Sequence, residues 1–475
     1  MSDRRGHGRR GWEVAVGEGV ATLLGFAATL MVARGCGATA FGRYETATAL
    51  AAWWLILVRG GVDAAIVRAG AISPNELRAL GIELRRVRSA WALVGWSAVV
   101  ALGAIGGDVG FAAVMGASLW IATLAPDLEA RALGETGVIG AASAAKGAAV
   151  LGWIALCAGW GIDDLRLAAA PAWGEAAAAL VFATRSPRER PIGREPRSIG
   201  SSVFDWSHAA ATATVWRFSR VALLSVDLLI LGSFGAATGP FAAARRACLA
   251  ILGIALAIAS AASGPLAGAG AVGVEECRRR RNDAARLLAW FVVPTSLGLA
   301  LTGSRWISLA FGDAFDVPAW LMIALAARIP AAVFGALSQT TAFALGEERT
   351  VARVAVAAVI AAGPAAGVGF AIAGATGASA ALVLVEIGSW FVVESRLVAR
   401  GVGIDASSFP IEPAGGAAGL MIGCAATIGA SAPAATIAGA AGFVTGAGFA
   451  RLAARSRRPA RPTCRVIAEA SRHGS

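Results

Sequence analysis

Apolar stretches of about twenty residues recur along the whole chain, and short polar or charged segments separate them. A bilayer core of ~30 Å needs about 20 apolar residues per helix, and backbone groups in lipid must bond within their own segment. The alternating ten-residue pattern of barrel strands is not found. We therefore predict an all-α integral membrane protein with about fourteen transmembrane helices. Their predicted ranges are 13–33, 44–66, 89–106, 109–126, 138–160, 167–184, 204–232, 241–262, 286–304, 318–343, 352–373, 377–397, 414–431 and 433–450.

Composition strengthens this prediction. The 475 residues are 57% hydrophobic and 15% charged, against roughly 25% charged in soluble proteins. The mean hydropathy is +0.67. A soluble fold could not bury so much apolar sequence and still present a polar surface. The net charge of +12 would suggest a nucleic-acid partner in a soluble protein. In this chain the distribution of the positive charge along the sequence indicates a membrane orientation instead.

The cationic residues are distributed unequally between the predicted loops. With the N-terminus in the cytoplasm, the inside segments carry 30 of the 42 Lys and Arg residues and the outside segments carry four. This is the positive-inside pattern, and it places both termini in the cytoplasm with no nucleic acid as partner. Eight cations fall within helices or at their ends: Arg59, Arg68, Lys146, Arg217, Arg220, Arg245, Arg246 and Arg328.

A weak internal repeat divides the chain. Gly42 and Gly239 stand 197 positions apart in similar segments, and Glu175 and Glu386 stand 211 apart. The Ala-Leu-Gly-Glu motif ending at Glu135 returns 212 positions later. This order predicts two six-helix lobes related as parallel repeats, an arrangement of alternating-access transporters. The predicted parts are an N-terminal lobe 1–184, a basic cytoplasmic linker 185–203, a C-terminal lobe 204–400, two appended helices within 401–450 and a basic cytoplasmic tail 451–475.

Three groups of motifs carry a resemblance to a known family. The first runs from Phe41 to Tyr44 and on to Gly61–Arg68, the second from Asp227 through Gly239 to Arg246, and the third from Ala344 to Arg349 and on to Gly374–Ala378. In their order and spacing, over residues 13–400, these motifs resemble the prokaryotic polysaccharide flippases. Those are the Wzx-like oligosaccharide exporters of the multidrug/oligosaccharidyl-lipid/polysaccharide superfamily.

The resemblance implies twelve to fourteen helices, two lobes and a central cavity. It also implies a multi-pass protein of the bacterial cytoplasmic membrane that moves an undecaprenyl-diphosphate-linked oligosaccharide from the inner to the outer leaflet. The expected partners are this lipid-linked oligosaccharide and membrane lipids. The family is not enzymatic.

The 204–232 helix carries charged residues on one face. At 100° per residue, Arg217, Arg220 and Asp227 fall within a stripe of about 80°. An isolated charge at mid-membrane costs at least ~2.5–3.5 kcal/mol, so the stripe should face a cavity or a partner. Arginine suits a diphosphate because its planar fork donates two bonds at once. We predict that Arg217 and Arg220 line a substrate cavity; a structural ion pair across the lobe interface is the alternative.

Other intramembrane cations are expected to have simpler roles. Arg59 could line the cavity, but it stands four residues before Asp63, and neutralisation within that pair is the favoured interpretation. Arg328 is a single cation at moderate depth and a further candidate for the cavity. Lys146, the single lysine, is expected to snorkel to the inner interface.

Carboxylates matter for energy coupling. The chain has no nucleotide-binding P-loop motif, so a bound proton or sodium ion would have to bias the transport states through a buried acid. The candidates are Asp227, Glu18, Glu175 and Glu386. The alternative for each is a hydrogen-bonded packing group.

Several remaining features are expected to be structural. Gly363 and Gly367 have the spacing of close helix packing, and Arg245 with Arg246 is expected at the outer interface. Tryptophans such as Trp53 and Trp390 fit interfacial belts. Scattered Cys and only three His residues predict no metal site and no cofactor.

Two other functions are weighed against the flippase. A cation-coupled multidrug or metabolite antiporter would need an acidic cavity, which the basic stripe disfavours. A membrane polysaccharide polymerase or ligase would need a sizeable outer loop with catalytic residues. The longest outside loop is about 305–317 and holds only Asp313 and Asp316 as acids.

Overall fold

The computed structural model describes residues 4–59, 74–106, 108–125, 135–160, 162–184, 203–233, 238–262, 266, 269 and 272–404. These residues belong to one compact unit, Met1–Ser408, while the unit Phe409–Ser475 lies outside the described residues. The predicted helices 414–431 and 433–450 fall in that second unit. The count of fourteen therefore stays a prediction, as do the proposed linker, appended helices and tail.

The described residues form helices and no strand. Each helix follows one or two of the predicted apolar stretches. The elements are α1 (Arg4–Arg59), α3 (Pro74–Gly106), α4 (Val109–Leu124), α6 (Thr136–Trp160), α7 (Asp164–Thr184), α8 (Val203–Ser233), α9 (Thr238–Ala261), α11 (Val274–Phe311), the short 3-10 helix η1 (Asp313–Phe315), α12 (Ala319–Ala344) and α13 (Glu348–Ala399).

Two of these elements are pairs of helices joined at a kink. In α1 the backbone leaves helical geometry at Gly37, with φ 75° and ψ 175°. In α13 it does so at Ala373 and at Gly374, which has φ 59° and ψ −144°. Glycine takes such positive φ values without the Cβ clash of other residues. The predicted helices 13–33 and 44–66 thus share α1, as far as Arg59, and 352–373 and 377–397 share α13.

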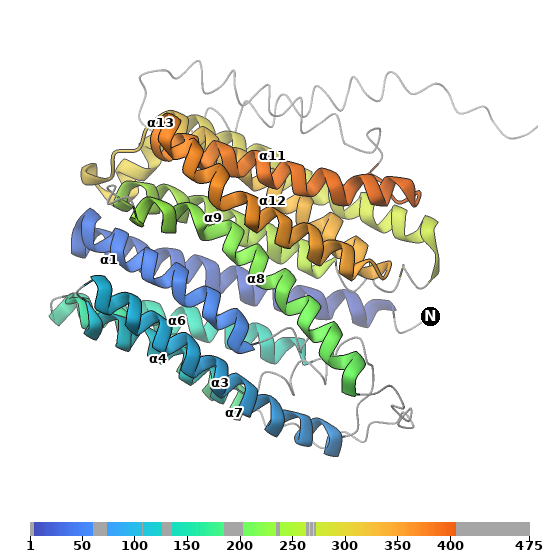
Figure 1. The fold of residues 1–475 in the computed structure, drawn as a ribbon, viewed down its shortest axis with the longest axis horizontal. Coiled ribbons are helices and arrows are strands. Elements are labelled where there is room, and N and C mark those ends of the chain that lie inside the picture. The colour runs from blue at the N-terminus through green and yellow to red at the C-terminus, as the bar shows by residue number, and fades with distance from the viewer. Residues whose placement is uncertain are drawn as a thin grey trace, which may run out of the picture. The chain divides into compact units, whose positions relative to one another are not determined.

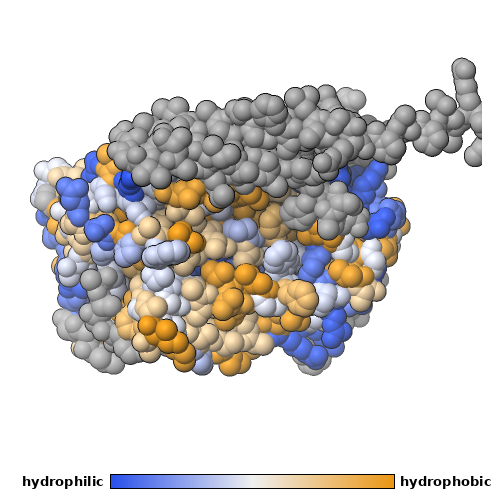
Figure 2. All heavy atoms as spheres, turned by 90° about the horizontal axis from the view of Figure 1, so that it is seen from above, coloured by the Kyte–Doolittle hydropathy of each residue, from blue (hydrophilic) through white to orange (hydrophobic). Residues whose placement is uncertain are grey.

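The molecule is a multi-pass membrane protein. Eight helices of the described residues are long and apolar enough to cross a bilayer. Large apolar side chains cover their outer faces, among them Ile372 at 80% exposure and Phe391 at 71%. Figure 2 shows apolar residues across the middle of one face and hydrophilic residues gathered toward the two ends. This pattern suits a lipid surround, where exposed apolar side chains need no burial.

Helix α1 packs against helices from both predicted lobes. It contacts α3, α4 and α6 of the first lobe and α8 and α9 of the second. Within the first lobe α6 packs on α7 and α3 on α4, and within the second α12 packs on both α11 and α13. Figure 1 shows α1 running beside α6 and α9. The parallel-repeat relation between the lobes stays a prediction.

At one end of the bundle α1 packs closely against α9 and α11; we call it the kink end. It holds Gly37 of α1, the start of α9 and the end of α11. Phe41 packs there against Phe311 and Phe315, with ring centroids 5.9 and 5.7 Å apart. The Arg34 side chain donates hydrogen bonds to the carbonyls of Ala310 and Leu309.

Glycines allow the closest approach of α1 and α9 at the kink end. A Cβ on Gly42 would lie 2.2 Å from Thr238 Oγ1, and one on Gly239 would lie 2.2 Å from the Ala38 carbonyl oxygen. Real side chains do not approach so closely, so both positions need glycine. The two glycines that mark the predicted repeat therefore pack into one interface.

The structure shows no packing contact for Gly363 and Gly367 among the residues that it describes. A Cβ at either position would meet nothing within 4 Å among the described residues. Instead Gly369 and Gly377, on the two sides of the α13 kink, contact each other's backbone: a Cβ on Gly369 would lie 2.3 Å from the Gly377 carbonyl oxygen. The Gly-x-x-x-Gly spacing is too common in a chain with 60 glycines to identify the contact.

We expect Gly239→Ala to lower the thermal unfolding midpoint of the detergent-solubilised protein, because its methyl group would overlap the α1 backbone. Overpacking of this kind costs on the order of 1–3 kcal/mol. Gly363→Ala is the matched control and should be neutral or slightly stabilising, since alanine has the better helix propensity. Equal midpoints for the two variants would contradict the close α1–α9 contact.

Candidate functional site

A buried ionic cluster joins three helices of the second lobe. Arg328 of α12 lies 2.7 Å from Asp227 Oδ2 of α8 through Nη1, and 2.8 Å from Glu386 Oε1 of α13 through Nε. Its Nη2 donates to the Leu223 carbonyl. All three charged residues are 5% exposed or less. Arg328 is thus not the single cation expected from the sequence; we call this group the Arg328 cluster.

Arg245 of α9 extends the Arg328 cluster to a fourth helix. Its Nε lies 3.4 Å from Asp227 Oδ1, and its guanidinium donates to the Leu224 carbonyl at 2.7 and 3.2 Å. Arg245 is buried, so the expectation of an interfacial position is wrong for it. Two cations face two carboxylates, which meets the requirement that buried charges be paired.

The predicted stripe on α8 is divided between two environments. Asp227 belongs to the Arg328 cluster, whereas Arg220 donates from Nη2 to the Ala332 carbonyl at 3.1 Å and has no carboxylate within salt-bridge distance among the described residues. Arg217 lies one turn away and is partly buried. Glu386 Oε2 is buried without a hydrogen-bond partner in the described part of the chain. Asp227 is thus paired with Arg245 and Arg328 of its own C-terminal lobe. The alternative of an ion pair across the lobe interface does not hold for it.

A second cluster holds Glu175 in the first lobe. Arg59 Nη2 of α1 lies 2.7 Å from Glu175 Oε2, and Lys146 of α6 pairs with Oε1. Glu175 is buried, while both cations are about a third exposed. Lys146 was expected to extend toward the inner membrane interface. Instead its ammonium group neutralises the buried Glu175 carboxylate. Asp63, the expected partner of Arg59, lies outside the described residues.

Glu18, the remaining coupling candidate, lies on the first segment of α1. It is partly buried, and its backbone carbonyl accepts a hydrogen bond from the Thr22 hydroxyl at 2.8 Å.

An ion pair between α1 and α9 escaped the sequence analysis. Glu45 of α1 is buried and its Oε1 lies 3.8 Å from Arg246 Nε of α9. The same nitrogen donates to Thr29 Oγ1 at 3.1 Å. The sequence did contain a signal for this pair. Glu45 stands near the start of the predicted helix 44–66, and Arg246 was expected at the outer interface, so both charges were predicted at the same end of the bundle.

A third ionic group lies at the opposite end of the second lobe. Arg281 of α11 is fully buried and pairs with Glu394 of α13, while its Nη2 donates to Ser338 Oγ at 2.9 Å. Trp390 also donates to Ser338, at 3.2 Å, and stacks on Phe334. Arg281 was counted among loop cations because α11 was expected to begin at 286, yet the helix begins at Val274.

The expected tryptophan belts are wrong for two residues. Trp390 lies between α12 and α13, as described above. Trp53 of α1 donates to Ser225 Oγ of α8 at 2.6 Å and packs edge-on against Phe218. Both indoles therefore bridge helices, because each N–H finds a hydroxyl partner within the bundle.

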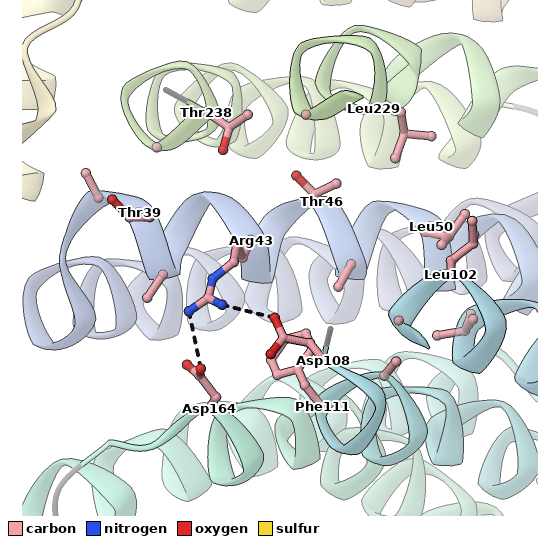
Figure 3. A pocket seen from close by; sticks show the side chains of 18 of the residues that line it. Thr39, Arg43, Thr46, Leu50, Leu102, Asp108, Phe111, Asp164, Leu229 and Thr238 are labelled. Atoms are coloured by element: carbon pink, nitrogen blue, oxygen red, sulfur yellow. Dashed lines mark hydrogen bonds and ion pairs between the residues drawn. The ribbon is translucent and has the colours of Figure 1, made fainter. Parts of the chain in front are cut away.

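A cavity of about 680 Å³ lies at the kink end, between the second segment of α1 and helices of both lobes. Figure 3 shows Arg43 at its wall, bonded to Asp108 and Asp164. Among the described residues no group of three or more His, Cys, Asp or Glu could hold a metal ion.

Comparison with known proteins identifies the fold. No protein-family model matches the chain, and no curated protein matches it. The inward-facing structure of a multidrug resistance MATE family transporter of the MOP superfamily is similar, with a TM-score of 0.57 and 15% identity over 80% of this chain and 95% of that one. Lipid II flippase MurJ, in an inward closed conformation, gives 0.59 and 11% over 92% and 97%.

A third similar structure is a MOP superfamily transporter from Pyrococcus furiosus, described as having a binding pocket of reversed polarity. It gives a TM-score of 0.58 at 14% identity over 83% of this chain and 96% of that one. Identities this low establish the fold alone. The chain is a multi-pass helical membrane protein with the fold of the MOP superfamily transporters.

Proposed function

We propose that the protein is a flippase that moves an undecaprenyl-diphosphate-linked oligosaccharide from the inner to the outer leaflet of a bacterial cytoplasmic membrane. The two predicted six-helix lobes would alternate access to a central site. The proposal rests on the fold, on the motifs from Phe41 onward and on the charge inside the bundle. It includes no enzymatic step.

The observation that carries the proposal is an excess of positive charge within the membrane-embedded helices. The described groups are Arg59, Lys146, Arg217, Arg220, Arg245, Arg246 and Arg328 against Glu18, Glu45, Glu175, Asp227 and Glu386. Leaving aside Glu13 and the Arg281–Glu394 pair, which lie near the ends of their predicted spans, seven cations stand against five acids. A net positive interior attracts a diphosphate and repels the organic cations that an acidic cavity would take.

Arg220 is the best candidate to contact the diphosphate. It is partly exposed, and its one described hydrogen bond is with the neutral Ala332 carbonyl. With one hydrogen bond to a neutral carbonyl, the Arg220 guanidinium keeps most of its N–H donors for a phosphate. Arg59 and Arg328 are already held by carboxylates, so we assign them the weaker role of shaping the field around the substrate. Arg217 would approach the substrate beside Arg220.

The close helix packing at the kink end supports an alternating-access mechanism. The charge asymmetry predicts that this end faces outward, and Gly42 packs there against the start of α9. Because α1 and α9 are in close contact at this end, substrate would enter from the cytoplasmic side. Glu175 and Glu386, the repeat-related acids, each lie in a cationic cluster of their own lobe, which favours the parallel-repeat interpretation.

Ion coupling would pass through the Arg328 cluster. Of the coupling candidates, Asp227 and Glu175 already have both carboxylate oxygens engaged by cations. Glu386 uses Oε1 for Arg328, whereas its buried Oε2 has no hydrogen-bond partner among the described residues. That oxygen can accept a proton or contribute to a sodium site at the lowest cost. Glu386 is therefore our first choice for the coupling acid.

Arg220→Ala should reduce flipping of a polyprenyl-diphosphate-linked oligosaccharide about 10- to 100-fold, because a charge-assisted bond of ~1.5–3 kcal/mol is lost. The assay uses purified protein in liposomes and follows lectin access to the sugar. Arg349→Ala, an exposed arginine on α13, is the matched control and should transport normally.

The same assay separates the alternatives. Full activity of Arg220→Ala would remove the proposed phosphate contact. Transport of a lipophilic organic cation, with no flipping of the lipid-linked sugar by the unaltered protein, would assign the chain to the antiporter alternative.

Glu386→Gln should abolish the stimulation of flipping by an imposed proton or sodium gradient, and it should lower the thermal unfolding midpoint because two buried cations then share the Asp227 carboxylate. Glutamine cannot exchange a proton, yet it keeps an oxygen for Arg328, which stays paired with Asp227. Glu275→Gln, on a residue whose side chain is 79% exposed, controls for the loss of a carboxylate. Stimulation that survives in Glu386→Gln would place coupling elsewhere.

A further inference from the structure

The cavity at the kink end has two chemically different parts. Its rim is polar: Arg43 Nη1 lies 3.0 Å from Asp108 Oδ2, and Nη2 lies 3.3 Å from Asp164 Oδ2. These side chains are about half exposed, so solutes can reach them. Below the rim the wall is apolar, with Leu50, Leu102 and others contributing. Figure 3 shows the three charged groups gathered on one side of the cavity.

The charge of the rim favours one class of head group. One arginine and two aspartates are the charged residues of the wall, so the rim carries a net charge of −1. Each carboxylate uses its Oδ2 for Arg43, which leaves the two Oδ1 atoms as acceptors for an ammonium group. The Arg43 guanidinium has five N–H donors and can also bind a phosphate beside that ammonium. A zwitterion with adjacent phosphate and ammonium groups matches this arrangement.

The apolar wall indicates that the ligand is an amphiphile. Phe111 of α4 and Leu229 of α8 face the cavity from opposite lobes, next to Leu50 of α1. A volume of about 680 Å³ lies within the range of ligand sites, roughly 300–1,000 Å³. It suits a head group with the first part of an acyl chain, while the rest of the chain would lie in the bilayer. Because the cavity lies in a membrane protein, phospholipids are always available to it.

We propose that this cavity binds an amine-bearing phospholipid, with the ammonium between Asp108 and Asp164, the phosphate on Arg43 and the acyl chains along Leu50 and Leu102. The lipid would occupy the seam between α1 and α8 at the kink end. This site is separate from the Arg328 cluster and does not depend on which substrate is transported.

The test is native mass spectrometry of the full-length, delipidated protein titrated with single phospholipids. Phosphatidylethanolamine should bind at least fivefold more tightly than phosphatidylglycerol, which has no ammonium. Phosphatidylcholine, whose ammonium has no N–H to donate, should fall between them. Soluble glycerophosphoethanolamine should bind weakly, because it has no chains for the apolar wall; if it binds as well as the lipid, the ligand is the free head group and the lipid proposal fails.

Variants locate the site. Asp108→Asn with Asp164→Asn should remove the preference for phosphatidylethanolamine, whereas Asp313→Asn with Asp316→Asn, on exposed acids, should keep it. Leu102→Trp fills the apolar part from a half-exposed position, so it tests the site without altering the charged rim and should weaken all three lipids. An unchanged lipid preference in the Asp108 and Asp164 double variant, or no preference in the unaltered protein, overturns the proposal.

Discussion

The second lobe depends on the pairing of Arg328 with two carboxylates. A charge in the apolar interior is costly unless it is paired and hydrogen-bonded. The contacts between Arg328, Asp227 and Glu386 therefore restrict how α8, α12 and α13 can rotate about their axes. Lipid gives helices little hydrophobic reason to associate, and polar contacts of this kind then select one packing among several. Arg245 adds α9 to the same constraint. Four helices are thereby aligned by charges that occupy a few positions.

The first lobe uses the same principle with a different set of residues. Glu175 of α7 is held by Arg59 of α1 and Lys146 of α6, so one buried acid aligns three helices. In both lobes the acid is more deeply buried than a typical charged residue, and cations neutralise it. Arg220 differs because its described bond is to a carbonyl. The contrast separates charges that are paired within the fold from Arg220, the one that we propose as the substrate contact.

Within the described residues the apolar stretches predicted where the helices lie, because their length and hydropathy depend on the bilayer and not on tertiary contacts. The candidate acids Asp227, Glu175 and Glu386 were also recognised, since charge within a span is conspicuous. Their partners could not be predicted, because pairing depends on how neighbouring helices rotate. Lys146 and Arg245 were assigned to interfaces for this reason, and Arg281 to a loop because the start of α11 was placed too late. The kink-end cavity combines residues of six helices, and no local pattern reveals it.

Helix α1 packs on both lobes, and this has a consequence for how the protein is made. Helix α1 precedes its α9 partner by about two hundred residues, so the ribosome makes α9 only after α1. Until then the Gly42 surface and the Glu45 carboxylate lack the α9 partners that they have in the folded protein. The interface between the lobes can therefore form only after synthesis of the first lobe is complete.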